Sequence, residues 1–346
     1  MPSLLRLAGL AIGLLLVLAA VRGARGQASR GSVILELAGG VALLAVSAFP
    51  ELALPLADFL GFRDEPFARL VAVLIVTTAG LFALVLVAIA KADRAHQRVG
   101  RLIRALSAAQ VEHDQADGRL GGVLVAVPAY NEAENLPAVL GEIPGTVAGL
   151  PTHALVIDDG SRDRTREVAA AHGARVVTHV VNSGQGAALQ TGYLVAERLG
   201  VDVVVTLDAD GQHDPAEMDR LVGPIVRGEA DFVVGSRRKG AYERESLARH
   251  LGITVFSHLV NLLGRTAVTD VANGYRAIRA SRLTEIVFTE EQFHNPELLM
   301  GVARAGLRVL EVPVTIRRRA GGQSKKGTTF RYGFGFLRVI LKTWLR

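Results

Sequence analysis

The sequence predicts an α/β fold, with a mainly parallel sheet covered by helices on both faces, preceded by an all-α membrane module. Apolar, β-branched runs alternate with helical patterns over residues 119–316, which is typical of parallel strands buried on both faces. Acidic or glycine-rich turns follow these runs repeatedly, and residues 1–90 are strongly apolar. The chain therefore divides into a membrane part and a part that carries the chemistry.

The composition predicts a membrane-associated protein of two or three domains. The chain has 346 residues, 50% of them hydrophobic, and its mean hydropathy of +0.31 is high for a purely soluble protein. It has no cysteine, which excludes disulfides, thiolate metal sites and a cysteine nucleophile. The basic residues behind the net charge of +6 concentrate beside apolar stretches and at the C-terminus. We therefore expect membrane lipids or phosphates as partners, and no nucleic acid. The oligomeric state is not predicted.

Three apolar segments, at about residues 4–21, 33–49 and 67–90, are each close to the roughly 20 residues that a spanning helix needs. We therefore expect three transmembrane helices within residues 1–90. Basic residues follow the first and third segments, whereas the connection between the second and third is acidic. Because Lys/Arg-rich flanks stay in the cytoplasm, we expect a multi-pass protein of the cytoplasmic membrane, with everything after Ala90 in the cytoplasm. A cleavable signal peptide is the alternative for the first segment.

Residues 91–118 predict a basic amphipathic stalk. Val99, Leu102, Ile103 and Leu106 recur at helical spacing with basic residues between them, as in a helix that lies along a membrane surface. A solvated linker helix has the same pattern, so both interpretations stay open. The polar stretch at residues 114–118 ends this pattern and marks a domain boundary.

Four buried strands are expected in the next domain, at residues 122–127, 154–157, 176–181 and 201–207. Polar or glycine-rich residues follow each of them. Because the carboxyl ends of parallel strands meet at one edge of a sheet, these turns are expected to form one cleft. A dinucleotide-binding fold is not supported. Its Gly-x-Gly-x-x-Gly motif follows a strand at the start of the fold, whereas Gly184-Gln-Gly186 follows the third expected strand and has Leu189 in place of the third glycine.

The last of these strands ends in two carboxylates, Asp208 and Asp210. Such charges are too costly to bury without partners. Hard oxygen ligands suit Mg²⁺ or Mn²⁺, which keeps several waters and bridges to the phosphates of a substrate. For an isolated Asp-X-Asp pair, the alternative interpretation is a polar turn that precedes a helix beginning at Pro215.

Seven short motifs occur in order within residues 121–326. They are Pro128-Ala-Tyr-Asn-Glu132, Ile157-Asp-Asp-Gly-Ser161, Asn182-Ser-Gly-Gln-Gly186, Asp208-Ala-Asp-Gly-Gln212, Gly235-Ser-Arg237, Asn273-Gly-Tyr-Arg276 and Arg319-Ala-Gly-Gly-Gln-Ser-Lys325. Together they resemble the inverting family-2 glycosyltransferases of the GT-A fold. The branch they resemble most is that of the dolichyl-phosphate mannose synthases and related polyprenyl-phosphate sugar transferases. Each motif alone is weak, and the order of all seven makes the resemblance specific.

The resemblance implies a GT-A glycosyltransferase domain over residues 119–316 and gives individual residues a role. The residues that would bind the nucleotide-sugar are Pro128, Tyr130, Glu132, Ile157, Asp159, Asp208, Ala209 and Arg237. The shell of a Mg²⁺ or Mn²⁺ cofactor would consist of Asp208, Asp210 and Gln212. The catalytic set would be Asp210, Arg319, Lys325 and Glu297. Arg237, Arg319 and Lys325 would hold diphosphate or acceptor phosphate, and a solvated basic tail is the alternative for Arg319 and Lys325.

The role of Glu297 distinguishes a hydroxyl acceptor from a lipid phosphate acceptor. In hydroxyl-accepting members of the superfamily, a carboxylate in this place acts as a general base, whereas a lipid phosphate is already an anionic nucleophile. In the lipid-phosphate branch the same carboxylate can remain as a structural or positioning residue. The neighbouring His294 is interpreted as a cleft-lining or core histidine.

Residues 317–346 contain no acidic residue, and basic side chains alternate there with aromatic and aliphatic ones. We expect a basic acceptor loop followed by a helix that lies in the lipid headgroup region. A C-terminal helix packed on the sheet is the alternative.

These expectations together describe a membrane-anchored hexosyltransferase. It would transfer a sugar, with inversion, from a nucleotide-diphospho-sugar to polyprenyl phosphate at the cytoplasmic leaflet. Transfer to a hydroxyl of a lipid-linked or cell-surface glycan, with Glu297 as general base, is one alternative. A non-catalytic, membrane-anchored binding protein is the other. The sequence identifies neither the nucleotide nor the sugar.

Overall fold

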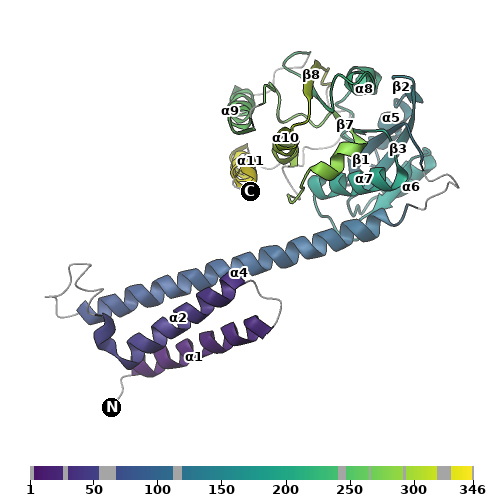
Figure 1. Cartoon of the computed structure of the whole chain (residues 1–346). Coiled ribbons are helices and arrows are strands. Elements are labelled where there is room, and N and C mark those ends of the chain that lie inside the picture. Colours follow the sequence, from purple (N-terminus) through teal and green to yellow (C-terminus); the bar gives the residue numbers. More distant parts are fainter. Residues whose placement is uncertain are drawn as a thin grey trace. The chain divides into compact units, whose positions relative to one another are not determined.

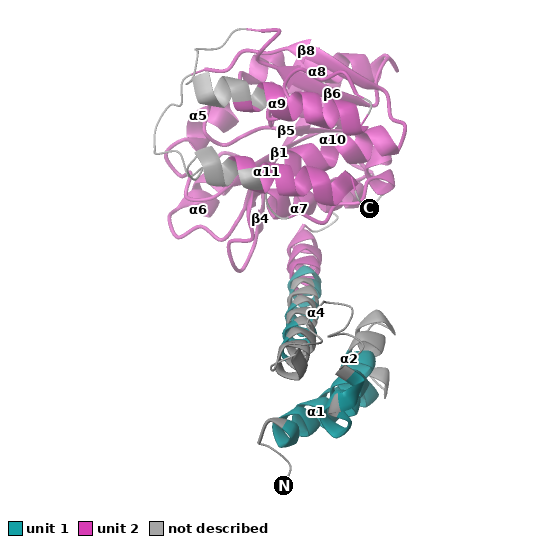
Figure 2. Cartoon of the chain, turned by 90° about the vertical axis from the view of Figure 1, so that its left-hand side faces the viewer, with its two compact units in different colours: residues 1–98 teal, residues 99–346 magenta. Residues whose placement is uncertain are grey.

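The computed structural model describes residues 4–25, 30–53, 68–111, 119–240, 247–264, 266–290, 294–317 and 329–344. The chain forms two compact units, unit 1 (residues 1–98) and unit 2 (residues 99–346), which Figure 2 shows in teal and magenta. Unit 2 contains the sheet and the predicted site.

Unit 1 is built on the packing of α1 (Leu4–Arg25) against α2 (Arg30–Ala48). Glycine allows the two helices to approach closely, because a Cβ on Gly40 would lie 2.9 Å from the backbone oxygen of Gly13. A short 3-10 turn, η1 (Pro50–Ala53), follows α2. In the part of the chain that the structure describes, no helix is both long enough and apolar enough to cross a membrane. The three spans predicted for residues 1–90 are therefore not supported.

The helix α4 (Ala68–Ala108) runs without a break from the third predicted span into the predicted stalk. Its apolar stripe of Val99, Leu102 and Leu106 is exposed, whereas Ala108 is buried and belongs to the core of unit 2. The predicted stripe thus lies at the surface, because another side of the helix packs against the domain.

Within its described residues, unit 2 contains one eight-stranded sheet with the order β2-β3-β1-β5-β7-β6-β8, and β4 pairs with β3. The strands are β1 (Val123–Ala129), β2 (Thr146–Val147), β3 (Leu150–Asp158), β4 (Arg175–Thr178), β5 (Val203–Thr206), β6 (Phe232–Ser236), β7 (Arg276–Arg279) and β8 (Val309–Pro313). The block β4-β3-β1-β5 is parallel, as are β6 and β8.

The sheet is mixed rather than mainly parallel, because β7 lies antiparallel between β5 and β6. The chain enters β7 at the edge where β5 and β6 end, since the Gly235 amide donates to the Tyr275 oxygen at 2.9 Å. A strand that starts at this edge can only run back through the sheet. The sequence alone did not indicate this reversal.

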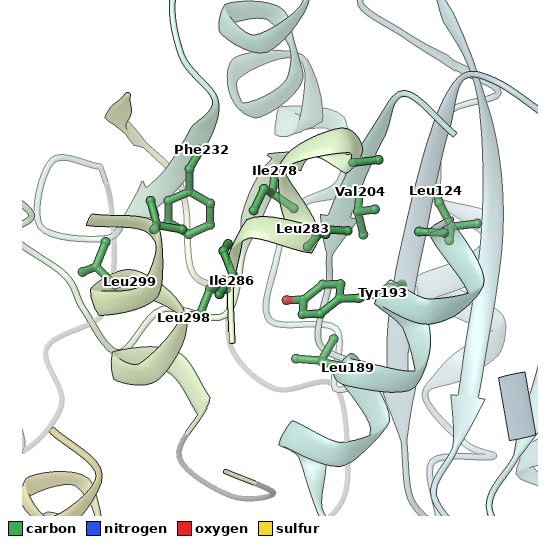
Figure 3. Close-up of a cluster of buried hydrophobic side chains, with 14 of the residues drawn as sticks. Leu124, Leu189, Tyr193, Val204, Phe232, Ile278, Leu283, Ile286, Leu298 and Leu299 are labelled. Atoms are coloured by element: carbon green, nitrogen blue, oxygen red, sulfur yellow. The ribbon is translucent and has the colours of Figure 1, made fainter. Parts of the chain in front are cut away.

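Helices cover both faces of the sheet, as predicted (Figure 1). One face carries α5 (Leu136–Gly141), α6 (Thr165–Ala171) and α8 (Met218–Val226), and the other carries α7 (Gln185–Leu199), α9 (Leu247–Gly264), α10 (His294–Arg304) and α11 (Thr329–Trp344). Two 3-10 turns, η2 (Pro215–Glu217) and η3 (Ala280–Glu285), complete the unit. The alternation along β1 explains the two layers, because Val123 and Val125 enter one core while Leu124 and Ala126 enter the other. Figure 3 shows the core that contains Leu124, where Leu124 and Val204 of the sheet lie beside Leu189 and Tyr193 of α7.

Several elements differ in their bounds from the sequence-based expectation, and β3 begins at Leu150 instead of residue 154. β4 ends at Thr178 instead of residue 181, because Val180 and Val181 are exposed and His179 turns inward. The C-terminal helix α11 buries Phe336 and Ile340 in the core of unit 2, as the packed alternative predicted.

Asp231 fixes the start of β6 at the amino-terminal edge of the sheet. Its carboxylate accepts two hydrogen bonds from Arg308, which precedes β8, with Nε–Oδ2 at 2.9 Å and Nη2–Oδ1 at 3.0 Å. These hydrogen bonds lower the pKa of Asp231 to about 2. Because the pKa is lowered in the folded state, the carboxylate stabilises the fold above its unfolded pKa, and this contribution is lost as the pH falls towards 2.

We therefore expect Asp231→Asn to lower the free energy of unfolding by about 1–2 kcal/mol at pH 7, allowing for the exposure of the arginine partner. The difference from wild type should persist down to about pH 4 and close towards pH 2. Denaturant unfolding followed by circular dichroism at several pH values measures it. A difference that is the same at pH 2 and pH 7 would contradict this role.

Candidate active site

The carboxyl ends of β1, β3 and β5 meet at one edge of the sheet, because the three strands run parallel. Hydrogen bonds join the turn after β1 to the turn after β3. The Asn131 amide donates to Ser161 Oγ at 2.9 Å, and Asn131 Oδ1 accepts from the Arg162 amide at 2.8 Å. Asn131 has a φ of 51°, a conformation that asparagine tolerates better than most residues. The two turns therefore form one surface.

Five residues predicted to bind the nucleotide-sugar lie at this edge. Ile157 and Ala209 are buried, at 0% and 4% exposure. Pro128, Tyr130 and Glu132 are partly exposed. Ile157 and Ala209 belong to the two cores of unit 2, and the three partly exposed residues lie at the end of β1 or in the turn after it. The individual roles of these residues stay predictions.

The two carboxylates of the predicted metal site follow β5. Asp208 Oδ1 accepts a hydrogen bond from Gln185 Nε2 at 2.8 Å, and Asp210 Oδ1 accepts one from the Gln212 amide at 3.1 Å. Both of these donors are neutral. Among the described residues, Asp208 has no Lys, Arg or His partner in an ion pair, so its negative charge is available to a cation.

His213 supports this turn from inside the domain. Its Nδ1 accepts from the Asp208 amide at 3.3 Å, and its Nε2 lies 3.1 Å from Asn273 Oδ1. Asn273 Oδ1 also accepts from the Tyr275 amide at 3.1 Å, and its Nδ2 donates to the Gly235 oxygen at 2.7 Å. These bonds fix the orientation of Asn273 and therefore assign the hydrogen of His213 to Nε2. The ring of His213 stacks on Tyr275 with centroids 4.9 Å apart.

Gly274 lies directly against the Asp208 carboxylate. A Cβ at this position would be 3.1 Å from Oδ1 and 3.3 Å from Oδ2. A Cβ at this position would therefore be in tight contact with the carboxylate and would require a small shift of one of the two.

The segment that leads into the predicted acceptor loop is bound to the same turn. The Arg317 amide donates to the Gln212 oxygen at 2.7 Å. The Arg317 guanidinium lies 2.6 Å from Glu142 Oε2 and 2.8 Å from Asp214 Oδ1. Its hydrogen bonds to these carboxylates, the one to Glu142 first, raise the pKa of Arg317. The turn that carries the metal carboxylates is thus held from outside by a fixed positive charge.

Two of the three predicted phosphate-binding residues, Arg319 and Lys325, lie outside the described residues. The third, Arg237, is buried and forms a fork on Asp270, with Nε–Oδ2 at 2.6 Å and Nη2–Oδ1 at 3.4 Å. Asp270 is fully buried at 0% exposure. This ion pair orients Arg237 as a structural residue, and its role towards phosphate stays a prediction.

Glu297 lies on α10 and is 0% exposed. Its Oε1 accepts from the amide and the hydroxyl of Thr289 at 2.9 and 3.0 Å, and its Oε2 accepts from the Glu290 amide at 3.0 Å. The carboxylate therefore holds the backbone of residues 289–290, which favours the structural or positioning role over that of a base. The neighbouring His294 is also buried, and burial lowers its pKa to about 3. It is neutral at physiological pH, as expected of a core histidine.

The residues at the end of β5 fit a magnesium or manganese ion. Asp208, Asp210 and Gln212 offer only oxygen ligands, which both ions prefer. Within the described residues, no group of three or more His, Asp or Glu side chains could hold a metal. The site would therefore supply two carboxylates and an amide and leave the remaining positions to water and substrate phosphates, as is usual for Mg²⁺.

Several residues of this site were not predicted as site residues. Gln185, which contacts Asp208, lies in the motif of residues 182–186, to which no function was assigned from the sequence. Gly274 belongs to another such motif, and the absence of a side chain there was the available signal. His213 and Arg317 act through contacts between segments far apart in the chain, which no local pattern reveals.

Comparisons with known proteins agree with this geometry. The sequence model of the family described as glycosyl transferase family 2 matches residues 124–286. An uncharacterised glycosyltransferase of Mycobacterium tuberculosis is 37% identical over 223 residues, which cover 64% of this chain and 96% of the relative. Undecaprenyl-phosphate mannosyltransferase of Micrococcus luteus is 33% identical, over 59% of this chain and 86% of its own length. Polyprenol monophosphomannose synthase of Mycolicibacterium smegmatis is 36% identical, over 58% and 80%.

A solved structure with a similar fold is glucosyl-3-phosphoglycerate synthase from Mycobacterium tuberculosis, in complex with Mn²⁺, UDP-glucose and phosphoglyceric acid. The TM-score is 0.52 and the identity 24%, with 66% of this chain and 80% of that chain covered. At this identity the likeness concerns the fold.

The position of Gly274 generates a test of the predicted metal site. We expect Gly274→Ala to weaken Mn²⁺ binding about tenfold, because a displaced catalytic group is costly even when the shift is small. Gly141→Ala is the matched control, since no atom lies within 4 Å of a Cβ at that position. Titration with Mn²⁺, followed by the electron paramagnetic resonance signal of the free ion, measures the affinity. Equal affinities in the two variants would show that Asp208 does not bind the ion.

Proposed function

The chain belongs to glycosyl transferase family 2, and we propose that it transfers a hexose from a nucleotide-diphospho-sugar to polyprenyl phosphate, with inversion at the anomeric carbon. The observation that carries this proposal is the pair of oxygen-donating carboxylates, Asp208 and Asp210, in the turn that follows β5. The named relatives from Micrococcus luteus and Mycolicibacterium smegmatis support a polyprenyl phosphate acceptor.

Asp208, Asp210 and Gln212 would hold Mg²⁺ or Mn²⁺, which neutralises charge developing on the leaving nucleoside diphosphate. Their turn is kept in place by His213 from inside and by Arg317 from outside. Preorganised ligands of this kind need no rearrangement during the reaction, so no free energy of reorganisation is subtracted from the electrostatic stabilisation of the transition state.

The acceptor supplies its own nucleophile. A phosphate oxygen forms a bond to the anomeric carbon while the bond from that carbon to the diphosphate oxygen breaks, and the electron pair leaves with the nucleoside diphosphate. Attack from the face opposite the leaving group inverts the configuration. No proton has to be removed, which is consistent with a Glu297 carboxylate occupied by the backbone of residues 289–290.

We also propose that the enzyme is held at the cytoplasmic membrane, with unit 2 in the cytoplasm, where a lipid acceptor meets a soluble donor. The support is the apolar surface of unit 1. Large apolar side chains that are exposed there are Leu7, Ile12, Leu14, Leu15, Leu18, Val21, Leu37, Val41, Phe49, Leu52, Leu74, Leu81 and Val85. A surface of this extent normally has an apolar partner, and lipid is the partner that suits the proposed acceptor. The exposed Leu341 and Trp344 of α11 would add a contact with the headgroup region.

The metal assignment predicts the effect of Asp210→Asn. The variant should fold normally and lose at least about a hundredfold in turnover, since removal of one stabilising contact to developing charge already costs about that much. Transfer of radiolabelled sugar to undecaprenyl phosphate, with Mn²⁺ and with chelator, measures it. Full activity of the variant in chelator would contradict the metal assignment.

The acceptor assignment predicts the effect of Glu297→Gln. The amide keeps the shape but replaces one acceptor oxygen by a donor, so the melting temperature should fall while turnover of the folded enzyme falls less than about tenfold. Thr289→Val is the matched control, because it removes one of the same hydrogen bonds and leaves the carboxylate. If Glu297→Gln abolishes turnover at an unchanged melting temperature while Thr289→Val remains active, Glu297 is a general base and the acceptor is a hydroxyl.

The localisation is tested by a reporter fused after Arg346. We expect it to report the cytoplasm, and we expect the protein to stay with the membrane fraction in high salt, because apolar contacts are not screened by ions. Removal of unit 2 by protease added to intact cells would contradict this arrangement.

A further inference from the structure

A buried histidine outside the predicted site connects β4 to the turn after β3. His179 follows β4 directly and is 1% exposed. Its Nδ1 lies 2.7 Å from Asp159 Oδ1, and its Nε2 lies 2.8 Å from Thr191 Oγ1 on α7. The Thr191 hydroxyl is also within reach of the Ala187 oxygen at 3.1 Å. Because a carboxylate only accepts, the Nδ1 of His179 carries a hydrogen.

The Asp159 carboxylate in turn fixes the start of α7. Its Oδ1 accepts from the Ser183 amide at 2.9 Å, and its Oδ2 accepts from the Gly184 amide at 2.7 Å. Gly184 has a φ of 94°, which favours glycine. One carboxylate therefore bonds two successive backbone amides and a histidine.

This turn reaches the predicted metal site through the next residue. Gln185 follows Gly184 directly, and its Nε2 donates to Asp208 Oδ1 at 2.8 Å. The contacts thus run from His179 to Asp159, from Asp159 to Gly184, and from Gln185 to Asp208. It spans the sheet edge from the end of β4 to the end of β5.

His179 itself is held from both sides. The His179 amide donates to the Asp158 oxygen at 2.8 Å. The preceding Thr178 is bonded by the end of α4 and the turn after it, where the Gln110 side chain donates to the Thr178 oxygen and accepts from the Thr178 amide, both at 2.9 Å. Ser107 Oγ donates to the same oxygen at 3.1 Å. The ring therefore has a fixed position from which it can orient Asp159.

We propose that His179 is a positioning residue for donor binding. It holds Asp159 so that the turn of residues 182–186 and the Asp208 carboxylate are preorganised for the nucleoside diphosphate part of the donor. This inference rests on the proposed function, and it concerns the hydrogen bond from Nδ1 to Asp159 rather than the bulk of the ring.

Substitution of His179 by asparagine or by glutamine distinguishes the hydrogen bond made by Nδ1 from the one made by Nε2. In His179→Asn, Nδ2 occupies about the place of Nδ1 and can still donate to Asp159, but the side chain is too short for Thr191. In His179→Gln, the longer side chain places its amide nearer to Thr191 and withdraws the donor from Asp159. Thr191→Val removes the partner of Nε2 and keeps Nδ1. The three variants therefore distinguish the hydrogen bond to Asp159 from packing.

The experiment measures binding of UDP and of GDP to the full-length protein by isothermal titration calorimetry, with Mn²⁺ and without acceptor. We expect His179→Gln to raise the Kd of the nucleotide that wild type binds by about tenfold, as for a lost hydrogen bond to a buried charge. His179→Asn and Thr191→Val should stay within about threefold of wild type. In the transfer assay, His179→Gln should raise the KM for the donor and leave the KM for the acceptor unchanged.

Wild-type affinity in His179→Gln would overturn the inference and leave the proposed function intact. Equal losses in His179→Gln and His179→Asn, in step with their melting temperatures, would show that the histidine is only a packing residue and would overturn it as well. If wild type binds neither nucleotide, the proposed function itself is wrong.

Discussion

The site depends on holding two carboxylates in one turn directly after β5. Asp208 and Asp210 accept hydrogen bonds from a side-chain amide and a backbone amide. A neutral donor orients a carboxylate without cancelling its charge, and among the described residues Asp208 has no Lys, Arg or His partner in an ion pair. Arg317, whose amide is bonded to the same turn, pairs through its guanidinium with Glu142 and Asp214. The turn is thereby held by a positive charge that is itself paired with these two carboxylates.

The reversed strand β7 makes this arrangement possible. Because the chain enters β7 at the edge where β5 ends, residues 273–275 lie behind the two carboxylates. This placement brings Asn273 to His213 and leaves room for the Asp208 carboxylate beside Gly274. The loops after β1, β3 and β4 close the same edge through hydrogen bonds between neighbouring turns. The turns are thus bonded to one another where the donor is expected, as preorganised sites require.

The sequence predicted the parallel half of the sheet and its polar edge, because both depend on local patterns. Buried runs such as Val203–Thr206 identify strands, and their carboxyl ends identify the site. The sequence did not predict the reversal of β7 or the roles of His213 and His179, because these depend on contacts between residues far apart in the chain. It also left two roles open for Glu297, whose environment is set by the backbone of residues 289–290. The spans predicted from hydropathy in residues 1–90 are not supported by the described helices.

The central claim is that the acceptor is a polyprenyl phosphate. Its most direct test is to incubate the wild-type enzyme with radiolabelled UDP- and GDP-sugars, Mn²⁺ and either undecaprenyl phosphate or undecaprenol, and to measure label in the lipid fraction. The account predicts label with the phosphate alone, in a product whose sugar is released by mild acid and has the inverted anomeric configuration. Label on undecaprenol, or a product with the retained configuration, would contradict it.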